Sequence, residues 1–540
     1  MLSNKDSVAI VISYSGEEQE IKRIVNYIKQ KEGTVIAVTS INDSYLRKNA
    51  DYCLTICSKE NIFSKIAYLY ITLPFLIFII GWTKWFIAVP VSIAIIYTLF
   101  RLFQKEDFLW QPNWDSNSIR LFFLIVIIIG TWVYFSGIGG FAFQNDDHRW
   151  RNEIFQMLVW YDWPLVKDVT INNLTETRGM IYYIGFWLPS AIIGKIFGMR
   201  AGYLFQMLWA ILGLTLVYYY VCAYIKKLSV YPLLAMIFFS GLDIVGYYMV
   251  NNDLNDLTNN SHIEFWCGFA QYSSMTTQLF WVFNQAIYAW LITCILLAQK
   301  DNRQIIFIWS LAMLNSTFPF VGMIPFLLYK IIANDLQHDV PPSKKIVLFF
   351  KEICTPENIV AGGAVGIISF IYLIGNISAN NVETSTTLSV GFVFLAFFFF
   401  LVEAGLYLFV MYPYQQKNAL YYLVILVLLI CPYINVGSGK DFSMRASIPA
   451  LFIMYLLFIE TFSACFHKKK YIITLGFMLL FLIGSITPLK EFNRTAHETY
   501  CMYNFGVDFP VQPVSEEEII GADNFSGSIQ NNFFFEYLAK

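Results

Sequence analysis

Charged side chains crowd into the stretch FQNDDHRWRNEIF, residues 143–155, which follows directly on a long apolar run. Carboxylates beside guanidinium groups can take a proton from a hydroxyl and can hold a phosphate anion. Asp147 and Arg151 lie four residues apart, so on a helix they share one face and the arginine can orient the carboxylate. We therefore predict Asp147 as a general base and Asp146 as a second catalytic carboxylate, with Arg149 and Arg151 as substrate-binding residues.

A purely structural role for the same cluster remains open. Asp146 stands where the helix would begin, and a carboxylate there is favoured by the positive end of the helix dipole. The other charges would then be ordinary interface charges. If the cluster is catalytic instead, partial desolvation at the membrane interface makes its carboxylate a stronger base.

A second polar group lies in SHIEFWCGFAQYSS, residues 261–274, among several aromatic side chains. Ligand sites commonly combine aromatic walls with a few well-placed polar groups. We predict that His262, Glu264 and Gln271 bind the substrate as part of a sugar platform. His262 and Glu264 could also hold a divalent cation near Asp146. The alternative is an aromatic loop that dips into the membrane interface.

The third group is GSGKDFSMRAS, residues 437–447, at the mouth of an apolar segment. Lys440, Asp441 and Arg445 are predicted to bind substrate, with Asp441 and Arg445 again four residues apart. Arg445 is the candidate for a lipid phosphate, because a guanidinium matches phosphate oxygens well. The alternative is an anchor that snorkels to the interface beside its own ion-pair partner.

Composition indicates that lipid surrounds most of the chain. Of the 540 residues, 57% are hydrophobic, 18% aromatic and 14% charged, whereas soluble domains carry about 25% charge. The formal net charge of −2 gives no reason to expect a nucleic-acid partner. The nine cysteines form no CxxC pair, which argues against a disulfide framework or a structural zinc site. We predict a mainly α-helical, multi-pass transmembrane bundle in the cell membrane, preceded by a short α/β fragment.

Apolar segments near the ~20 residues needed to cross a bilayer recur along the chain, and we expect about 12–14 spans. The segments are 66–83, 86–103, 119–138, 180–198, 201–225, 231–250, 283–299, 305–333, 359–376, 391–411, 419–436, 447–465 and 471–487.

Lysine and arginine content orients these spans. The N-terminus shows no cleavable signal pattern and is predicted to be cytoplasmic. The loops predicted to lie outside are 139–179, 251–281, 377–390 and 437–446, together with the tail from 488.

Two segments fit this alternation poorly. We expect 180–198 to be short, tilted or re-entrant, interrupted by Pro189 and two glycines, and 305–333 to be broken at NSTFP. Within the first outer loop, apolar residues at helical spacing predict an amphipathic helix on the membrane surface, with Trp150 and Tyr161 on its apolar face.

The region 119–225 resembles the GT-C class of membrane glycosyltransferases, which includes protein O-mannosyltransferases and aminoarabinose transferases. The matching residues are Asp146-Asp147, Asp162-Trp163-Pro164, Tyr182-Tyr183 and Gly194-Lys195. The resemblance implies an outer-face carboxylate as general base, a polyprenyl-phosphate-linked sugar donor drawn from the membrane lipid, and an extracytoplasmic acceptor. The chain departs from the class in having two extra spans before the acidic loop. The residues identify no specific cofactor, and a divalent cation remains an option.

The first 62 residues resemble part of the sugar-isomerase (SIS) fold. The order strand, turn, helix, strand, short helix, strand is predicted, and Ser13, Ser15 and Gly16 match the Ser-x-Ser-Gly phosphate-binding turn of that fold. The front half of a complete SIS domain is missing. The fragment is therefore either ligand-free or a sensor that needs a partner chain. We place the domains at 1–62, 63–487 and 488–540.

These features favour a membrane glycosyltransferase that acts on a cell-envelope glycan, a lipid or a protein. A membrane glycan polymerase or ligase would share the same surface chemistry. A transporter or flippase is the third hypothesis. It is disfavoured because the charges gather on one face and no internal repeat is visible. Asp243 is an acidic residue within a predicted span, and it is not included among the predicted site residues.

Overall fold

The structure is a computed structural model of residues 1–540. It describes all residues except 1–7, 14–18, 40–44, 56–60, 106–108, 172–173, 253–261, 338–340, 377–388, 435, 437–439 and 507–509. The chain divides into two units, Met1–Lys65 with Arg101–Leu109, and Ile66–Phe100 with Trp110–Lys540.

The first unit holds a three-stranded parallel sheet in the order β1-β2-β3. Its elements are β1 (Val8–Ile12), α1 (Gln19–Gln30), β2 (Thr34–Thr39), α2 (Tyr45–Asn49) and β3 (Tyr52–Thr55). The helices bury one small apolar core against the sheet, made of Val11, Val25, Ile28, Val35, Ala37 and Leu46. The predicted α/β fragment is confirmed. The phosphate-binding turn proposed at Ser15 and Gly16 lies outside the described residues.

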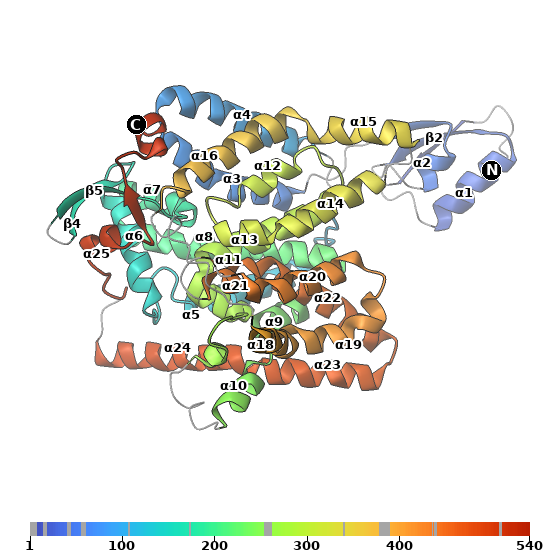
Figure 1. Ribbon diagram of the computed structural model, residues 1–540. Coiled ribbons are helices and arrows are strands. Elements are labelled where there is room, and N and C mark those ends of the chain that lie inside the picture. Colours follow the sequence, from blue (N-terminus) through green and yellow to red (C-terminus); the bar gives the residue numbers. More distant parts are fainter. Residues whose placement is uncertain are drawn as a thin grey trace. The chain divides into compact units, whose positions relative to one another are not determined.

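The second unit is a bundle of apolar helices (Figure 1). In the part of the chain that the structure describes, ten helices are long and apolar enough to cross a membrane, or eleven if one bent pair is counted as a span. Six are single helices: α3 (Ile62–Trp82), α4 (Trp85–Phe103), α5 (Ser116–Phe135), α8 (Met199–Ile225), α11 (Met275–Ala298) and α22 (Ile448–His467).

The other candidate spans are assembled from shorter pieces. They are α9 (Tyr231–Phe238) with α10 (Asp243–Asn251), α13 (Thr317–Gly322) with α14 (Ile324–Leu336), α18 (Val390–Phe400) with η5 (Leu401–Gly405) and α19 (Leu406–Gln415), and α23 (Tyr471–Gly484) with α24 (Ile486–Phe505). The bent pair is formed by α15 (Pro342–Ile353) with η4 (Glu357–Gly362) and α16 (Gly363–Leu373).

The multi-pass helical fold is confirmed, although the number of long spans is lower than the predicted 12–14. Two of the predicted segments form only short apolar helices, η1 (Gly185–Trp187) with α7 (Leu188–Phe197), and α20 (Ala419–Ile430) with η6 (Cys431–Tyr433). Pro189 lies in the first turn of α7, directly after Leu188, and does not break the helix, because the missing N–H of a proline costs no hydrogen bond there. The expected break at NSTFP is present, because α12 (Ile305–Ser310) ends before it and α13 begins within it.

The segment 139–179, predicted to be the first outer loop, folds into α6 (Asp147–Trp160) and a hairpin of β4 (Val166–Ile171) and β5 (Leu174–Met180). α6 is buried on most sides, including its polar residues Asn152 and Glu153, whereas Trp150 and Tyr161 are only partly covered. It therefore does not present one apolar face to lipid as predicted. Gly194 of α7 permits this packing, since an added Cβ would lie 2.7 Å from Val159.

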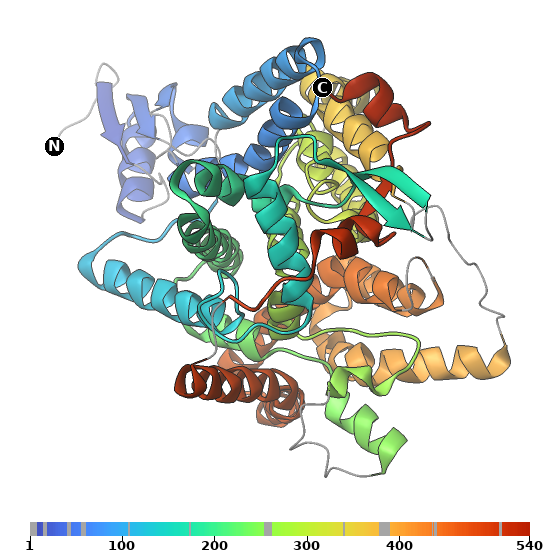
Figure 2. The same cartoon turned by 90° about the vertical axis from the view of Figure 1, so that its left-hand side faces the viewer.

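The chain enters the tail after 488 through α24, which continues almost directly from α23 (Figure 1). It then forms α25 (Glu516–Gly521), β6 (Ser526–Ser528) and η7 (Phe534–Leu538). Strand β6 pairs antiparallel with β5, so the tail completes a three-stranded sheet with the β4–β5 hairpin (Figure 2). The C-terminal segment thereby supports the loop that carries the acidic cluster.

Candidate functional site

A cavity of about 310 Å³ lies within the second unit, where segments from four parts of the sequence meet. It is lined by Asp147, His262, Phe265, Gln271, Ser273, Thr277, Trp281, Val282, Lys440, Asp441, Met444 and Arg445. Six of the residues predicted for the site therefore surround one space, although they come from three separate loops. The roles assigned to them remain predictions.

The N-terminus of α6 is fixed against α11, and this places Asp147 at the cavity. Asn145 donates a hydrogen bond to the carbonyl of Phe280 at 3.0 Å. The ring of His148 stacks on Phe283 with centroids 5.4 Å apart, and its Nε2 donates to the carbonyl of Ser136 at 3.1 Å. Burial lowers the pKa of His148 to about 3. His148 is therefore a neutral packing residue at physiological pH.

The predicted contact between Asp147 and Arg151 is present. Nη2 of Arg151 donates to Oδ2 of Asp147 at 2.8 Å. Arg151 also lies over the ring of Phe283 at 5.4 Å and leaves its buried Nη1 without a hydrogen-bond partner. The Asp147 side chain is half-buried, with 46% of it exposed. The fold therefore provides Asp147 with a fixed arginine partner in a half-buried position.

The second acid–arginine pair comes from α21 (Asp441–Ala446), just before α22. Nη1 of Arg445 donates to Oδ2 of Asp441 at 3.2 Å and to the hydroxyl of Tyr183 at 3.3 Å, while its buried Nε has no partner. Burial opposes the charge of Arg445, but Tyr183 and Asp441 outweigh it and raise the pKa of Arg445 above its ordinary value. The guanidinium keeps its charge and still has a donor available to a ligand.

α21 also brings Lys440 to the cavity, with its ammonium 4.4 Å from the ring centre of Phe265. Burial lowers the pKa of Lys440. The close seating of α21 depends on Gly322 of α13, where an added Cβ would lie 1.9 Å from the carbonyl oxygen of Ala446. Lys440 and Arg445 thus give the cavity two cationic groups from one short helix.

His262 and Trp281 form the aromatic side of the cavity. Their rings meet edge to face with centroids 4.3 Å apart, and the indole N–H of Trp281 donates to Glu491 at 3.0 Å. Nδ1 of His262 lies 3.5 Å from the same carboxylate. Burial and the nearby cations lower the pKa of His262 to about 3. The histidine is therefore neutral, and its contact with Glu491 is a polar contact, not an ion pair.

Glu264 does not line the cavity, contrary to prediction. Its side chain is 1% exposed and accepts hydrogen bonds from the backbone of Ser274 and from Gln271 Nε2, both at 3.0 Å. Gln271 does line the cavity, and Glu264 holds the Gln271 side chain in place through this hydrogen bond. Burial, followed by the charge of Asp243, raises the pKa of Glu264 to about 8.

Asp146 and Arg149 also point elsewhere. Asp146 occupies the N-cap position of α6 and is exposed, but its side chain makes no capping hydrogen bond. Arg149 is exposed and donates from Nε to the carbonyl of Gln512 in the tail at 3.4 Å. Neither residue lines the cavity. Both were assigned from adjacency in sequence, and successive residues on a helix face different directions.

The proposed cation site finds no support in the geometry. Glu264 is engaged by Ser274 and Gln271, while His262 faces Glu491. Among the described residues, no group of three or more His, Cys, Asp or Glu side chains is arranged to hold a metal ion.

Trp281, Tyr183 and the tail residues Glu491 and Arg494 also belong to the site, although none of them is among the predicted site residues. Arg494 stacks over Trp281 at 5.2 Å and pairs with Glu491 at 2.5 Å. Trp281 was placed in a loop because its span was expected to begin at 283, whereas α11 begins at Met275. Tryptophan is enriched at the membrane–water interface, where spans end. This preference is the signal by which the sequence could have indicated Trp281.

The arrangement combines two carboxylates, each held by an arginine, with an ammonium group, unsatisfied buried donors and aromatic walls. Such a cavity can take up a polar ligand that carries both hydroxyl groups and negative charge. Its volume of about 310 Å³ is at the lower end of the range typical of ligand pockets, roughly 300–1,000 Å³. A single small polar group fits this space better than an extended chain does.

Comparison with known proteins concerns the N-terminal region. A family model described as SIS domain matches residues 1–78. An uncharacterised HTH-type transcriptional regulator of Clostridium perfringens is 39% identical over 62 residues, which cover 12% of this chain and 22% of the regulator. No solved structure matches the chain. The N-terminal region is thus similar to a SIS domain, and that similarity covers a small part of the chain.

Proposed function

We propose that this chain is a membrane glycosyltransferase that moves a sugar from a polyprenyl-phosphate donor to an extracytoplasmic acceptor. The observation that carries the proposal is the gathering of Asp147, Lys440 and Arg445 around one small cavity with aromatic walls. Glycosyl transfer from a lipid phosphate needs a base for the acceptor and cations for the departing phosphate. The cavity offers both.

In the proposed reaction, Asp147 takes the proton of the acceptor hydroxyl as its oxygen attacks the anomeric carbon of the sugar. The bond between that carbon and the phosphate oxygen breaks, and the polyprenyl phosphate leaves with the electron pair. Arg151 keeps the Asp147 carboxylate oriented through its 2.8 Å contact. An exposed carboxylate remains accessible to an incoming acceptor, and orientation is the contribution that the protein makes.

Arg445 and Lys440 are assigned to the phosphate. The Nε of Arg445 is buried without a partner, and such an orphaned donor is costly unless a ligand oxygen meets it. Asp441 and Tyr183 hold the guanidinium in place through Nη1. Trp281 and Phe265 supply apolar faces for the sugar ring, and Gln271 supplies a polar edge.

The test is sugar transfer by the purified full-length chain in proteoliposomes supplied with radiolabelled polyprenyl-phosphate sugars and membrane acceptors. Asp147→Asn is expected to abolish transfer. Asp146→Asn is the matched control, because it is the adjacent carboxylate and does not line the cavity. Binding of donor should persist in Asp147→Asn, since the phosphate contacts are intact. Equal transfer by Asp147→Asn and wild type would remove the base assignment.

A membrane glycan polymerase or ligase would use the same residues and differ only in the acceptor. A transporter or flippase is favoured by a different observation. Asp243 and Glu403, both 1% exposed, are buried within candidate spans. Asp243 accepts hydrogen bonds from Ser240 and Thr487, each at 2.8 Å. Donor that crosses the vesicle membrane without being consumed would support transport and contradict the transferase.

A further inference from the structure

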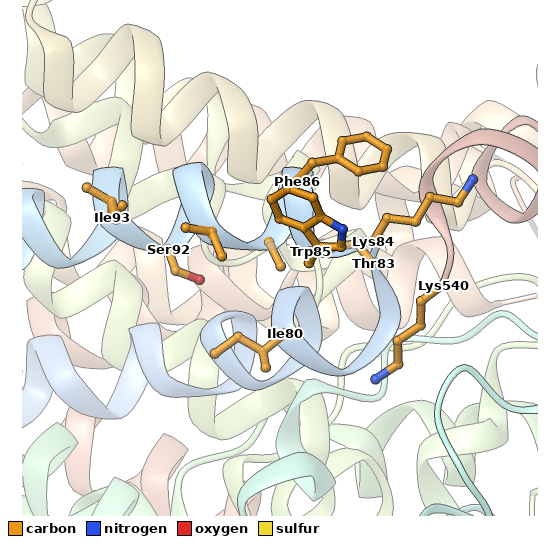
Figure 3. Close-up of a pocket in the computed structure, with 10 residues that line it drawn as sticks. Ile80, Thr83, Lys84, Trp85, Phe86, Ser92, Ile93 and Lys540 are labelled. Atoms are coloured by element: carbon orange, nitrogen blue, oxygen red, sulfur yellow. The ribbon is translucent and has the colours of Figure 1, made fainter.

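Apart from the candidate site, the second unit contains a larger hollow between α3 and α4, with a volume of about 860 Å³ (Figure 3). Its walls are Ile80, Thr83, Lys84, Trp85, Phe86, Ala88, Val89, Ser92, Ile93 and Lys540. None of these residues lines the cavity at Asp147. We refer to this hollow as the α3–α4 groove, and we propose that it binds an anionic phospholipid. The proposal does not depend on the transferase activity.

Most of the groove surface is apolar and faces outward. Ile80 is 60% exposed on α3, and Ile93 is 63% exposed on α4. Only 28% of the apolar window of α4 is buried within the protein, compared with 94% for α11. Both α3 and α4 are candidate membrane spans. Acyl chains are therefore the material that contacts this surface in a bilayer.

One end of the groove is cationic. Figure 3 shows Lys84 and Lys540 at the same end, with Ile93 and Ser92 toward the other. None of the ten lining residues is acidic. Lys84 donates to the backbone carbonyls of Tyr537 at 3.0 Å and Glu536 at 3.3 Å. An ammonium group has three protons, so one remains for a lipid phosphate oxygen.

The rim of the groove also matches the headgroup region of a membrane. Trp85, 78% exposed, begins α4 beside Lys84, and aromatic side chains next to lysine at a helix end are typical of the interface. The hydroxyl of Thr83 is already engaged by the carbonyl of Ile79. Charge selectivity in the groove therefore comes from the two lysines. Basic pockets between transmembrane helices are known to bind anionic headgroups.

A lipid held here would join two parts of the protein. The C-terminal residues reach the groove through hydrogen bonds from Lys84 N to Leu538 O at 2.9 Å and from Lys540 N to Trp82 O at 3.0 Å. The same tail segment supplies β6 to the sheet of the outer loop. A phosphate bound by Lys84 would strengthen the attachment of the tail, because the same ammonium group donates to the carbonyls of Glu536 and Tyr537. Anionic lipid is thus expected to raise the thermal stability of the full chain.

Native mass spectrometry of the purified full-length chain measures the retained lipid after incubation with phosphatidylglycerol or phosphatidylcholine. Wild type is expected to retain phosphatidylglycerol more strongly. Lys84→Gln should weaken that preference about fivefold, the effect of one lysine near a lipid phosphate, and leave phosphatidylcholine unchanged. Lys227→Gln, at an exposed lysine just after the C-cap of α8, is the control and should behave as wild type.

A second variant, Ile93→Trp, fills the groove without changing charge and should reduce retention of both lipids. It keeps the test decisive if Lys84→Gln disturbs the tail. Equal retention of the two lipids by wild type would overturn the proposal, as would unchanged phosphatidylglycerol binding in both variants. Displacement of phosphatidylglycerol by an equimolar polyprenyl phosphate would also overturn it, because the groove would then belong to the carrier lipid.

Discussion

Replacement of Glu264 by glutamine is expected to make the protein more stable at alkaline pH and to leave its stability at acidic pH almost unchanged. Glu264 is 1% exposed, and its pKa is raised from 4.5 to about 8 by burial and then by the charge of Asp243. The folded protein therefore binds a proton that the unfolded chain releases as the pH rises from 4.5 to about 8.

The sign follows from that difference in proton binding. The contribution of Glu264 is fully present below its unfolded pKa and is lost as the pH rises through its folded pKa. Each pH unit in the window from 4.5 to about 8 lowers the stability by about 1.4 kcal/mol, so the whole interval gives a loss on the order of 5 kcal/mol. Glutamine has no proton to lose, and its side-chain oxygen can still accept from Ser274 N.

The assay is thermal unfolding of the detergent-solubilised full chain at about pH 5 and about pH 9, the two sides of the window. The unfolding midpoint of wild type should fall more steeply with pH than that of Glu264→Gln. Other buried groups, such as Glu153 with a pKa raised to about 7 by burial, titrate in both proteins and cancel in the comparison. Glu517→Gln is the exposed control. Parallel midpoints for wild type and Glu264→Gln would refute the reasoning from burial.

Arg445→Lys keeps a positive charge but loses the planar fork that contacts Asp441 and Tyr183. Loss of one charge-assisted hydrogen bond costs about 1.5–3 kcal/mol, which predicts roughly a ten- to hundredfold lower kcat/KM for sugar transfer. An unchanged kcat/KM would mean that a positive charge at this position is sufficient for activity. Glu516→Gln weakens the contacts of α25 with Lys167 and Tyr161. Because this pair is partly exposed, a loss of at most about 1 kcal/mol is expected, seen as several-fold faster limited proteolysis of the C-terminal segment. Glu517→Gln should be cut at the wild-type rate, and equal cleavage of both variants would exclude this anchor.

Much of the site could be predicted because its signals are local. Asp147 and Arg151, like Asp441 and Arg445, are separated by one helical turn, and both pairs form in the structure. Three of the loops predicted to lie outside, 139–179, 251–281 and 437–446, contribute residues to a single cavity, while their side of the membrane stays a prediction. Orientation within a loop was less predictable. Glu264 and His262 are two residues apart, yet one is buried beneath Gln271 and the other lines the cavity.

The tail shows most clearly where local signals fail. Its polar, irregular composition gave no indication that β6 would pair with β5, or that Glu491 and Arg494 would contact Trp281. The same holds for α6, whose polar Glu153 is buried by neighbours far away in sequence. Such burial depends on packing against segments that are distant in sequence, and the spacing of apolar residues within one segment does not reveal it.

By itself, the sequence determined that this is a multi-pass helical membrane protein with a small α/β unit at its N-terminus, because apolar length and strand periodicity are properties of short segments. It also determined which acid–arginine pairs share a helix face. Only the tertiary structure decided which predicted residues surround a common cavity, and which ones, such as Arg149 and Glu264, face the tail or the interior. The physical reason is that side-chain direction and burial depend on contacts between segments, which become defined only when the helices pack.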